Sequence, residues 1–297
     1  MKNIAAFLNP SDAELRRYTS LPFFSLNDKL DEKELCRQLG ELKKKDIDEA
    51  ILHARGGLLT EYLSDEWFEK IGACVRFAAE NGMGIWLYDE HGWPSGFANG
   101  LVMEDAPEFC VSYLKKEGDK ISIKYNPYYA DILQRDATAK FIELTHREYY
   151  KRFSKYFGNT IFGFFTDEPQ WMQWEVPYTK GVFALFQERY GYSVEDRLEE
   201  LFTNCGNYRQ TRYHYYSLMT ELFNCNYTQQ LYQFCEETGI QMTGHTVQED
   251  NLMGQILGCG GIMPFYEFEH MPGIDYLGRD IGNPCAIRPA SSVAVQM

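Results

Sequence analysis

The clearest candidates for chemistry in this sequence are two adjacent acids, Asp167 and Glu168, that follow a short apolar segment. That segment, residues 160–165, is typical of a buried strand, and Pro169 ends it because proline has no N–H to donate within a central sheet. Adjacent side chains of an extended segment point in opposite directions, so we expect only one acid to face a pocket directly. A carboxyl group at an apolar pocket mouth loses solvation, which raises its pKa towards the range of a general acid. We therefore predict that Glu168 is catalytic and that Asp167 supports it; the alternative is that these acids only cap a helix.

A second cluster lies in residues 88–96, where Asp89, Glu90 and His91 leave an apolar segment together. The loop that follows is rich in glycine and proline and contains Trp93. An aromatic ring beside carboxylates suits a sugar, because the ring stacks on C–H groups while the carboxylates accept hydrogen bonds from hydroxyls. We expect all four side chains to contact a substrate. Two alternatives stay open: Trp93 belongs to the core, and the three polar residues bind a hard cation.

Polar and aromatic side chains also follow other predicted strands. A lone histidine at such a position is more often hydrogen-bonded scaffolding than catalytic, and a tryptophan there can simply pack a loop. Their shared position at one edge of a sheet leads us to expect substrate contacts from five of them: His53, Arg55, Trp171, His245 and Asp275. Trp174, in the same loop as Trp171, has the same two interpretations.

The elements that position these residues alternate along the chain. Predicted strands cover residues 21–26, 49–54, 84–88, 160–165, 240–244 and 263–268. Predicted helices include residues 31–45, 64–81 and 136–156, with another beginning near Pro289. A hairpin near 101–135 and a helical segment near 179–238 interrupt the pattern as insertions.

This alternation predicts parallel βαβ units, in either an open doubly wound sheet or a (β/α)8 barrel. A dinucleotide-binding open sheet has a glycine-rich turn after its first strand, whereas this chain has Asn27 and Asp28 there. A barrel instead collects polar residues at the carboxyl ends of several strands, as this sequence does. We predict an α/β fold: a single, incomplete TIM-type barrel of about six βα units spanning all 297 residues.

Composition narrows the partners. With 29 basic and 43 acidic residues the net charge is −14, which disfavours nucleic acid and anionic membranes as partners. No apolar run approaches 18 residues, so we expect no membrane span. The 8 cysteines form no CxxC pair, which predicts reduced thiols in a cytoplasmic protein.

Several other reaction classes lack their motifs, because the sequence contains no GxSxG, HExxH or GxxxxGK[ST] segment. Carboxylates, histidines and aromatic rings on a barrel rim leave glycoside hydrolysis as the leading class. A glycoside or oligosaccharide is then the expected substrate.

The motifs also resemble a known family. Residues 85–96, IWLYDEHGWPSG, closely resemble the YDE-x-GWPSG signature of glycoside hydrolase family 106, the α-L-rhamnosidases and their relatives. The supporting segments occur in the family's order: 61–67 (EYLSDEW), 164–169 (FFTDEP), 272–275 (PGID) and 291–294 (SSVA). The resemblance covers nearly the whole chain from about residue 20.

The resemblance implies a (β/α)8 catalytic domain that hydrolyses terminal α-L-rhamnosides with inversion, with a calcium ion that helps to hold the sugar. It implies that Glu168 is the general acid. The family's second catalytic glutamate follows strand seven, just beyond the segment that matches 291–294. Strands seven and eight and that glutamate are therefore expected beyond Met297, which leaves an exposed edge and an open apolar seam. The alternative is a truncated, non-catalytic carbohydrate-binding fragment that keeps the sugar contacts of Trp93, Asp89 and Glu90.

Overall fold

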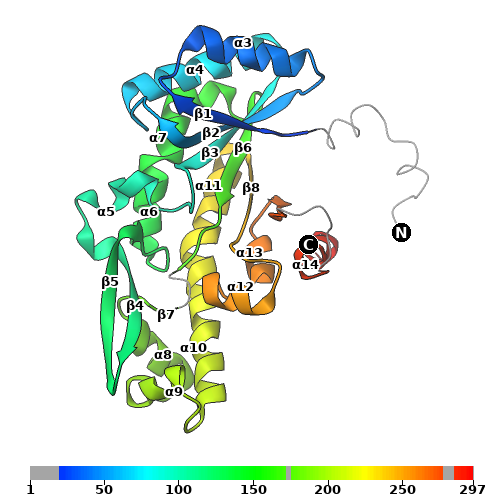
Figure 1. Ribbon diagram of the computed structural model, residues 1–297. Helices are drawn as coiled ribbons and strands as arrows, with labels where there is room; N and C mark the ends of the chain where they lie inside the picture. Colours follow the sequence, from blue (N-terminus) through cyan, green and yellow to red (C-terminus); the bar gives the residue numbers. More distant parts are fainter. Residues whose placement is uncertain (1–19, 172–174, 277–283, 297) are drawn as a thin grey trace.

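The computed structural model describes residues 20–171, 175–276 and 284–296, and the statements below concern these residues. The main sheet has six parallel strands in chain order (Figure 1). They are β1 (Phe23–Asp28), β2 (Glu49–Leu58), β3 (Gly84–His91), β6 (Ile161–Asp167), β8 (Gln241–His245) and β9 (Met271–Pro272). The predicted mixed α/β architecture with parallel strands is confirmed.

Helices cover one face of this sheet (Figure 1). They are α3 (Glu32–Lys43), α4 (Asp65–Glu80), α6 (Arg135–Leu144), α7 (His146–Phe153) and α11 (Gln229–Thr238). The first two begin at side-chain caps, because Asp31 accepts a hydrogen bond from the N–H of Glu34 and Ser64 accepts one from that of Trp67. Strand alternation sends every second side chain to this face, where Leu52, Leu87 and Phe164 join the main core.

The opposite face, here called the inner face, carries a smaller apolar cluster. Ile51, Trp86 and Tyr88 are buried there and Phe165 packs against them. The ring of Phe23 from β1 lies 5.0 Å from that of Phe165 but is 45% exposed. Among the described residues, β1 and β9 each pair with one neighbour and not with each other, so the sheet is open between them.

Two insertions lie beyond the carboxyl ends of the strands (Figure 1). The predicted hairpin forms β4 (Cys110–Glu117) and β5 (Lys120–Ala130), and β7 (Val176–Tyr178) adds a third antiparallel strand. The helical insertion consists of α8 (Val182–Tyr190), α9 (Leu198–Phe202) and α10 (Tyr208–Phe223), which continues through a π-helical turn (Asn224–Thr228) into α11.

Three predicted elements differ from the structure. The segment 263–268 is not a strand: α13 (Ile262–Tyr266) occupies it, because Ile262, Phe265 and Tyr266 are buried at helical spacing. The predicted helix 136–156 is divided at Thr145, whose φ of −110° and ψ of −82° are not helical and whose hydroxyl and N–H both donate to the carbonyl oxygen of Phe141.

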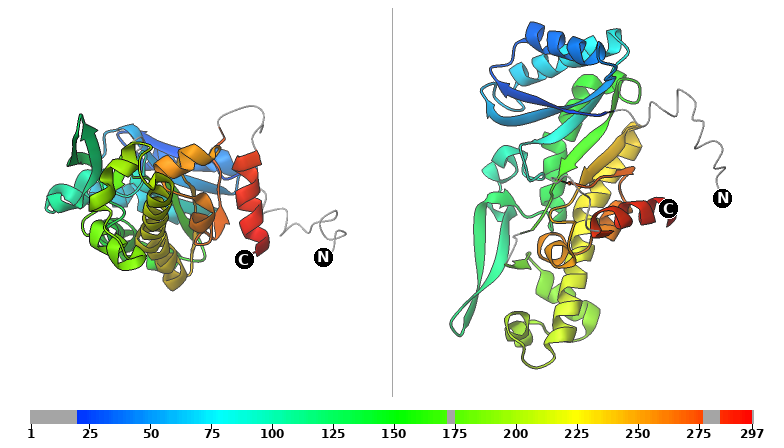
Figure 2. Two further views of the ribbon diagram at one scale, coloured as in Figure 1. Left: turned by 90° about the horizontal axis from the view of Figure 1, so that it is seen from below. Right: turned by 45° about the vertical axis from the view of Figure 1, so that its right-hand side comes forward.

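The helix expected near Pro289 begins earlier, as α14 (Pro284–Gln296). It contacts α13 beside the edge of the sheet, as Figure 2 shows from two directions. A further helix, α12 (Leu252–Gly258), follows β8. In the described part of the chain, no helix combines the length and apolar character needed to cross a membrane.

Candidate active site

The centre of the candidate site is an ion pair between the last residues of two neighbouring strands. Asp167 ends β6 and His245 ends β8, and the two are partners in the parallel register. The Nε2 atom of His245 lies 2.8 Å from Oδ1 of Asp167. The strands thus bring together two residues that are 78 positions apart in the sequence.

Asp167 is held from two further directions. Its Oδ2 atom accepts a hydrogen bond of 2.6 Å from the hydroxyl of Tyr88 on β3. Its backbone N–H donates to Oγ of Ser95 at 2.8 Å. Burial acts to raise the pKa of Asp167, but the hydrogen bond and positive charge of His245 and the hydroxyl of Tyr88 hold it below its usual value. Asp167 is therefore a fixed anion at neutral pH.

His245 faces a hydrogen-bond acceptor at each ring nitrogen. Nε2 faces Asp167, while Nδ1 lies 3.2 Å from the carbonyl oxygen of Thr246 and 3.5 Å from Oε1 of Glu249. Burial acts to lower the pKa of His245, but its hydrogen bond with Asp167 and the charges of Asp167 and Glu249 raise it to about 9. The imidazole is consequently protonated at neutral pH.

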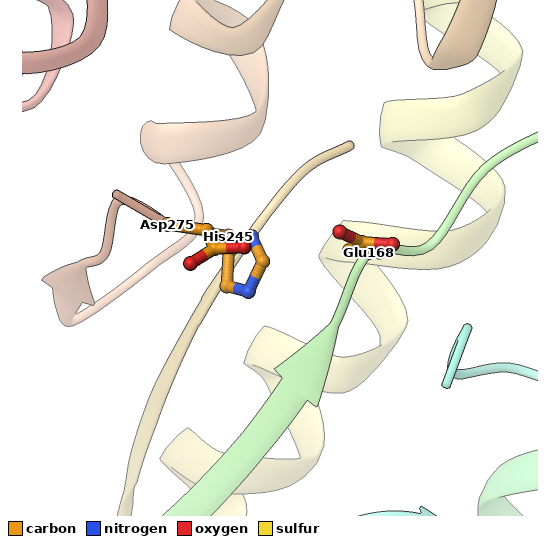
Figure 3. A group of neighbouring side chains, drawn as sticks. All are labelled: Glu168, His245 and Asp275. Carbon is orange, nitrogen blue, oxygen red and sulfur yellow. The ribbon is translucent and has the colours of Figure 1, made fainter. Parts of the chain in front are cut away.

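Glu168 lies near His245 and Asp275 (Figure 3). A carboxylate oxygen of Glu168, a ring nitrogen of His245 and a carboxylate oxygen of Asp275 lie within 4.8 Å of one another. Burial raises the pKa of Glu168, and the negative charge of Asp167 raises it further, while the charge of His245 opposes both. A half-buried carboxyl group with a raised pKa at the carboxyl end of a strand is suited to proton donation.

The expectation that only one of the two acids faces the site is wrong. Both lie next to His245, because the extended conformation ends at Asp167 and Glu168 adopts a left-handed φ of 47°. Its backbone N–H donates to the carbonyl oxygen of His245 at 3.1 Å, which fixes this turn. Left-handed backbone at a non-glycine residue costs about 1–3 kcal/mol, and such strain concentrates at functional sites.

Two members of the site were not anticipated from the sequence. Glu249 accepts a hydrogen bond from the backbone N–H of Asp275 and so joins the segments after β8 and β9. Its position four residues after His245 was the available signal. Tyr88 resembles core material in sequence, yet alternation puts it on the inner face together with Trp86.

Glu168, His245 and Asp275 have the composition of a metal site. We therefore asked whether these residues could coordinate calcium. Calcium takes six to eight oxygen ligands, and imidazole is not among the usual ones. A metal also needs a free lone pair on nitrogen, whereas both nitrogens of His245 face acceptors. Glu168 and Asp275 alone supply too few oxygens, so these described residues do not fit the calcium ion that the resemblance implies.

Glu90 was expected to contact a substrate, but the structure places it inside the protein. It is fully buried, and its carboxylate accepts five hydrogen bonds of 2.6–3.3 Å from backbone N–H groups of the loop that follows β3. The donors are His91, Gly96, Phe97, Ala98 and Asn99. Burial raises the pKa of Glu90 to about 7 although these N–H groups lower it. Glu90 thus shapes the loop from inside and is not presented to a substrate.

Asp89 is also fully buried, on the helix-covered face of β3. Its Oδ1 accepts a hydrogen bond of 2.6 Å from Oγ of Ser95, and Nε2 of His146 lies 3.9 Å from Oδ2. Burial raises the pKa of Asp89 well above its usual value. The prediction that Asp89 contacts a substrate is therefore not supported. Side chains alternate along a strand, so Asp89 faces away from the inner face on which its neighbour Tyr88 lies.

Trp93 is the accessible aromatic ring of this loop. Its side chain is 56% exposed, and the guanidinium carbon of Arg55 lies 5.5 Å from the ring centroid. His91 packs its ring against Tyr62 and places Nε2 3.3 Å from the carbonyl oxygen of Arg55. Arg55 on β2 and Trp93 in the loop after β3 are therefore available to a ligand, and the alternative that Trp93 belongs to the core is wrong.

The remaining predicted residues are buried. His53 lies on the inner face with its ring stacked on Tyr88 at 3.8 Å, and burial together with the charge of Arg55 lowers its pKa to about 4. Trp171 is 1% exposed and packs edge-on against Phe223, so the loop-packing alternative describes it. Trp174 lies outside the described residues.

Comparisons with known proteins bear on the fold. No family model and no curated protein matches the sequence. A rhamnosidase from Novosphingobium sp. PP1Y aligns at a TM-score of 0.44 and 17% identity, over 62% of this chain and 18% of that one. A β-galactosidase from the Antarctic haloarchaeon Halorubrum lacusprofundi aligns at 0.55 and 9% identity, over 89% of this chain and 42% of that one.

A structure of the pneumococcal virulence factor StrH aligns at a TM-score of 0.45 and 11% identity, over 93% of this chain and 64% of that one. The chain thus spans less than two thirds of each of these three proteins. At such low identity, the similarity to the β-galactosidase establishes a common fold and no more.

Proposed function

We propose that this chain is a large part of the (β/α)8 catalytic domain of a glycoside hydrolase, with Glu168 as its general acid. The observation that carries the proposal is the half-buried carboxyl group of Glu168, whose pKa is raised by burial and by the charge of Asp167, as suits a general acid. Its position at the carboxyl end of β6 is where enzymes of the barrel fold assemble their catalytic groups. The fold shared with a β-galactosidase is consistent with this reaction class.

The proposed substrate is a terminal α-L-rhamnoside, on the resemblance of residues 85–96 to the signature of family 106. The sugar would stack on Trp93, with Arg55 beside the ring. Glu90 and Ser95 contribute indirectly, because their hydrogen bonds hold the loop that carries Trp93.

In the reaction, Glu168 would protonate the glycosidic oxygen while Asp167 and His245 keep their charges. Inversion requires a second carboxylate about 6.5–9.5 Å from the first, with a water molecule between them. Asp275 does not meet this requirement, because carboxylate oxygens of Asp275 and Glu168 lie within 4.8 Å of each other. The inverting proposal therefore assigns the second carboxylate to a residue other than Asp275.

The test is hydrolysis of aryl α-L-rhamnosides within a panel of aryl glycosides, with and without calcium. We expect the complete domain, which supplies the second carboxylate, to release the sugar, and Glu168→Gln within it to lose about 10²–10⁴-fold in rate on substrates with poor leaving groups. The loss should shrink as the leaving group becomes more acidic, because such a group needs no proton. Glu188→Gln, an exposed glutamate on α8, is the matched control.

The carbohydrate-binding alternative predicts a different result, and the exposed ring of Trp93 favours it equally. In that case the chain binds L-rhamnose, Trp93→Ala weakens the binding, and no glycoside is hydrolysed. Equal loss by Glu168→Gln for every leaving group would contradict the role of general acid.

A further inference from the structure

His245 lies among the acidic residues of the candidate site, and these neighbours determine its protonation state. The titratable groups that face His245 come from the segments that end or follow β6, β8 and β9: Asp167, Glu168, Glu249, Glu269 and Asp275. Tyr88 on β3 and His53 on β2 interact with Asp167 rather than with His245. Among the described residues, His245 is the basic group of this cluster.

The hydrogen-bond geometry decides the protonation state. A neutral imidazole has one N–H and one lone pair, so it satisfies one donor and one acceptor. Nε2 of His245 faces the carboxylate of Asp167, and Nδ1 faces the carbonyl oxygen of Thr246 and the carboxyl group of Glu249. A carbonyl oxygen can only accept, and the Asp167 carboxylate can only accept, so both ring nitrogens must carry hydrogen.

We propose that His245 is a fixed imidazolium that serves as the counter-ion of this carboxylate cluster in place of a bound metal ion. The buried pair with Asp167 is then neutral overall, which is the condition under which buried charges are tolerated. Burial raises the pKa values of Glu249 and Glu269, and the charge of His245 opposes this shift at both groups. A divalent cation at the same place would meet an imidazolium, which has no nitrogen lone pair to offer it.

The charge of His245 has a consequence for Glu168, and that consequence rests on the function proposed above. The positive charge opposes the effects of burial and of Asp167, which both raise the pKa of Glu168. His245 is thus a positioning residue that limits the pKa of the general acid without touching the substrate. The positive charge of His245 is proposed independently of whether the protein hydrolyses glycosides.

Nuclear magnetic resonance of the ¹⁵N-labelled chain tests the charge directly. We expect both ring nitrogens of His245 to be protonated at pH 7, with a titration midpoint near 9, about 2.5 above that of free histidine. His146 is the internal control, because it is equally buried but its pKa is lowered to about 3, so it stays neutral. The signal is assigned by its absence in His245→Gln, or by a lowered midpoint in Glu249→Gln should the first variant not fold.

Titration calorimetry with calcium, manganese and zinc at pH 7 tests whether the carboxylate cluster around His245 binds a metal ion. We expect no saturable binding up to about millimolar concentrations. The proposal is overturned by a neutral His245 at pH 7, or by stoichiometric metal binding that is lost in Glu168→Gln and Asp275→Asn. Neither readout uses catalysis, so a chain that hydrolyses nothing would defeat the proposed function and leave this one standing.

Discussion

Ser95 offers the sharpest test of how the loop after β3 is joined to the candidate site. Its hydroxyl donates to Oδ1 of Asp89 at 2.6 Å and accepts from the N–H of Asp167 at 2.8 Å, and the residue is fully buried. Ser95→Ala removes one oxygen atom and leaves both partners buried without this hydrogen bond. Each such group costs about 1–3 kcal/mol, so we expect the free energy of unfolding to fall by about 3 kcal/mol.

Equilibrium unfolding in urea at pH 7 measures this loss. Ser112→Ala is the matched control, because Ser112 is 4% exposed and its hydroxyl makes one hydrogen bond, of 3.0 Å, to the carbonyl oxygen of Tyr178. That variant should lose about 1 kcal/mol. If Ser95→Ala loses no more than Ser112→Ala, the two hydrogen bonds do not join the loop to β3 and β6 and the reasoning fails.

Three further predictions follow from single features. Trp93→Ala should weaken binding of L-rhamnose about tenfold without changing stability, because the ring is exposed; unchanged affinity in calorimetry would mean that no sugar stacks there. Because the general acid must be protonated, kcat/KM should fall as pH rises through the raised pKa of Glu168, and this alkaline limb should be absent in Glu168→Gln. Gly163→Ala should destabilise by about 3 kcal/mol in urea unfolding, since its Cβ would lie 2.2 Å from the ring of Trp86, whereas Gly56→Ala, with nothing within 4 Å, should change little.

Local rules account for most of the secondary structure predicted from the sequence. The helix at Glu32–Lys43 begins at an acidic cap and ends in a basic last turn, as the helix dipole prefers. The strand at Ile161–Asp167 is an apolar segment ended by polar residues. These features depend on near neighbours in the chain, so the sequence displays them directly.

The errors arise where distant parts of the chain compete with local preference. The segment 263–268 is apolar and short enough for a strand, yet burial at helical spacing makes Ile262–Tyr266 a helix and leaves the sixth strand only two residues, Met271–Pro272. A short apolar run carries too little periodicity to separate the two outcomes.

The residues of the candidate site also fall into those that the sequence identifies and those that only the structure places. Residue types and their position after strands were sufficient to identify Glu168, Asp167 and His245 as members of one edge of the sheet. The sequence could not separate the buried acids Asp89 and Glu90 from the exposed Trp93, because all but one of the hydrogen-bond donors to those acids lie six to nine residues away on a loop whose path is irregular.

The adjacent acids Asp167 and Glu168 show which features the sequence determines and which depend on tertiary structure. The sequence alone determined that an apolar strand ends before Pro169 and that two carboxyl groups follow it. Only the tertiary structure decided that both reach His245, because the left-handed turn at Glu168 is fixed by a hydrogen bond to the neighbouring strand. It also decided their opposite pKa shifts, because a buried carboxyl group responds to the charge beside it: Asp167 is paired with an imidazolium, and Glu168 lies next to Asp167.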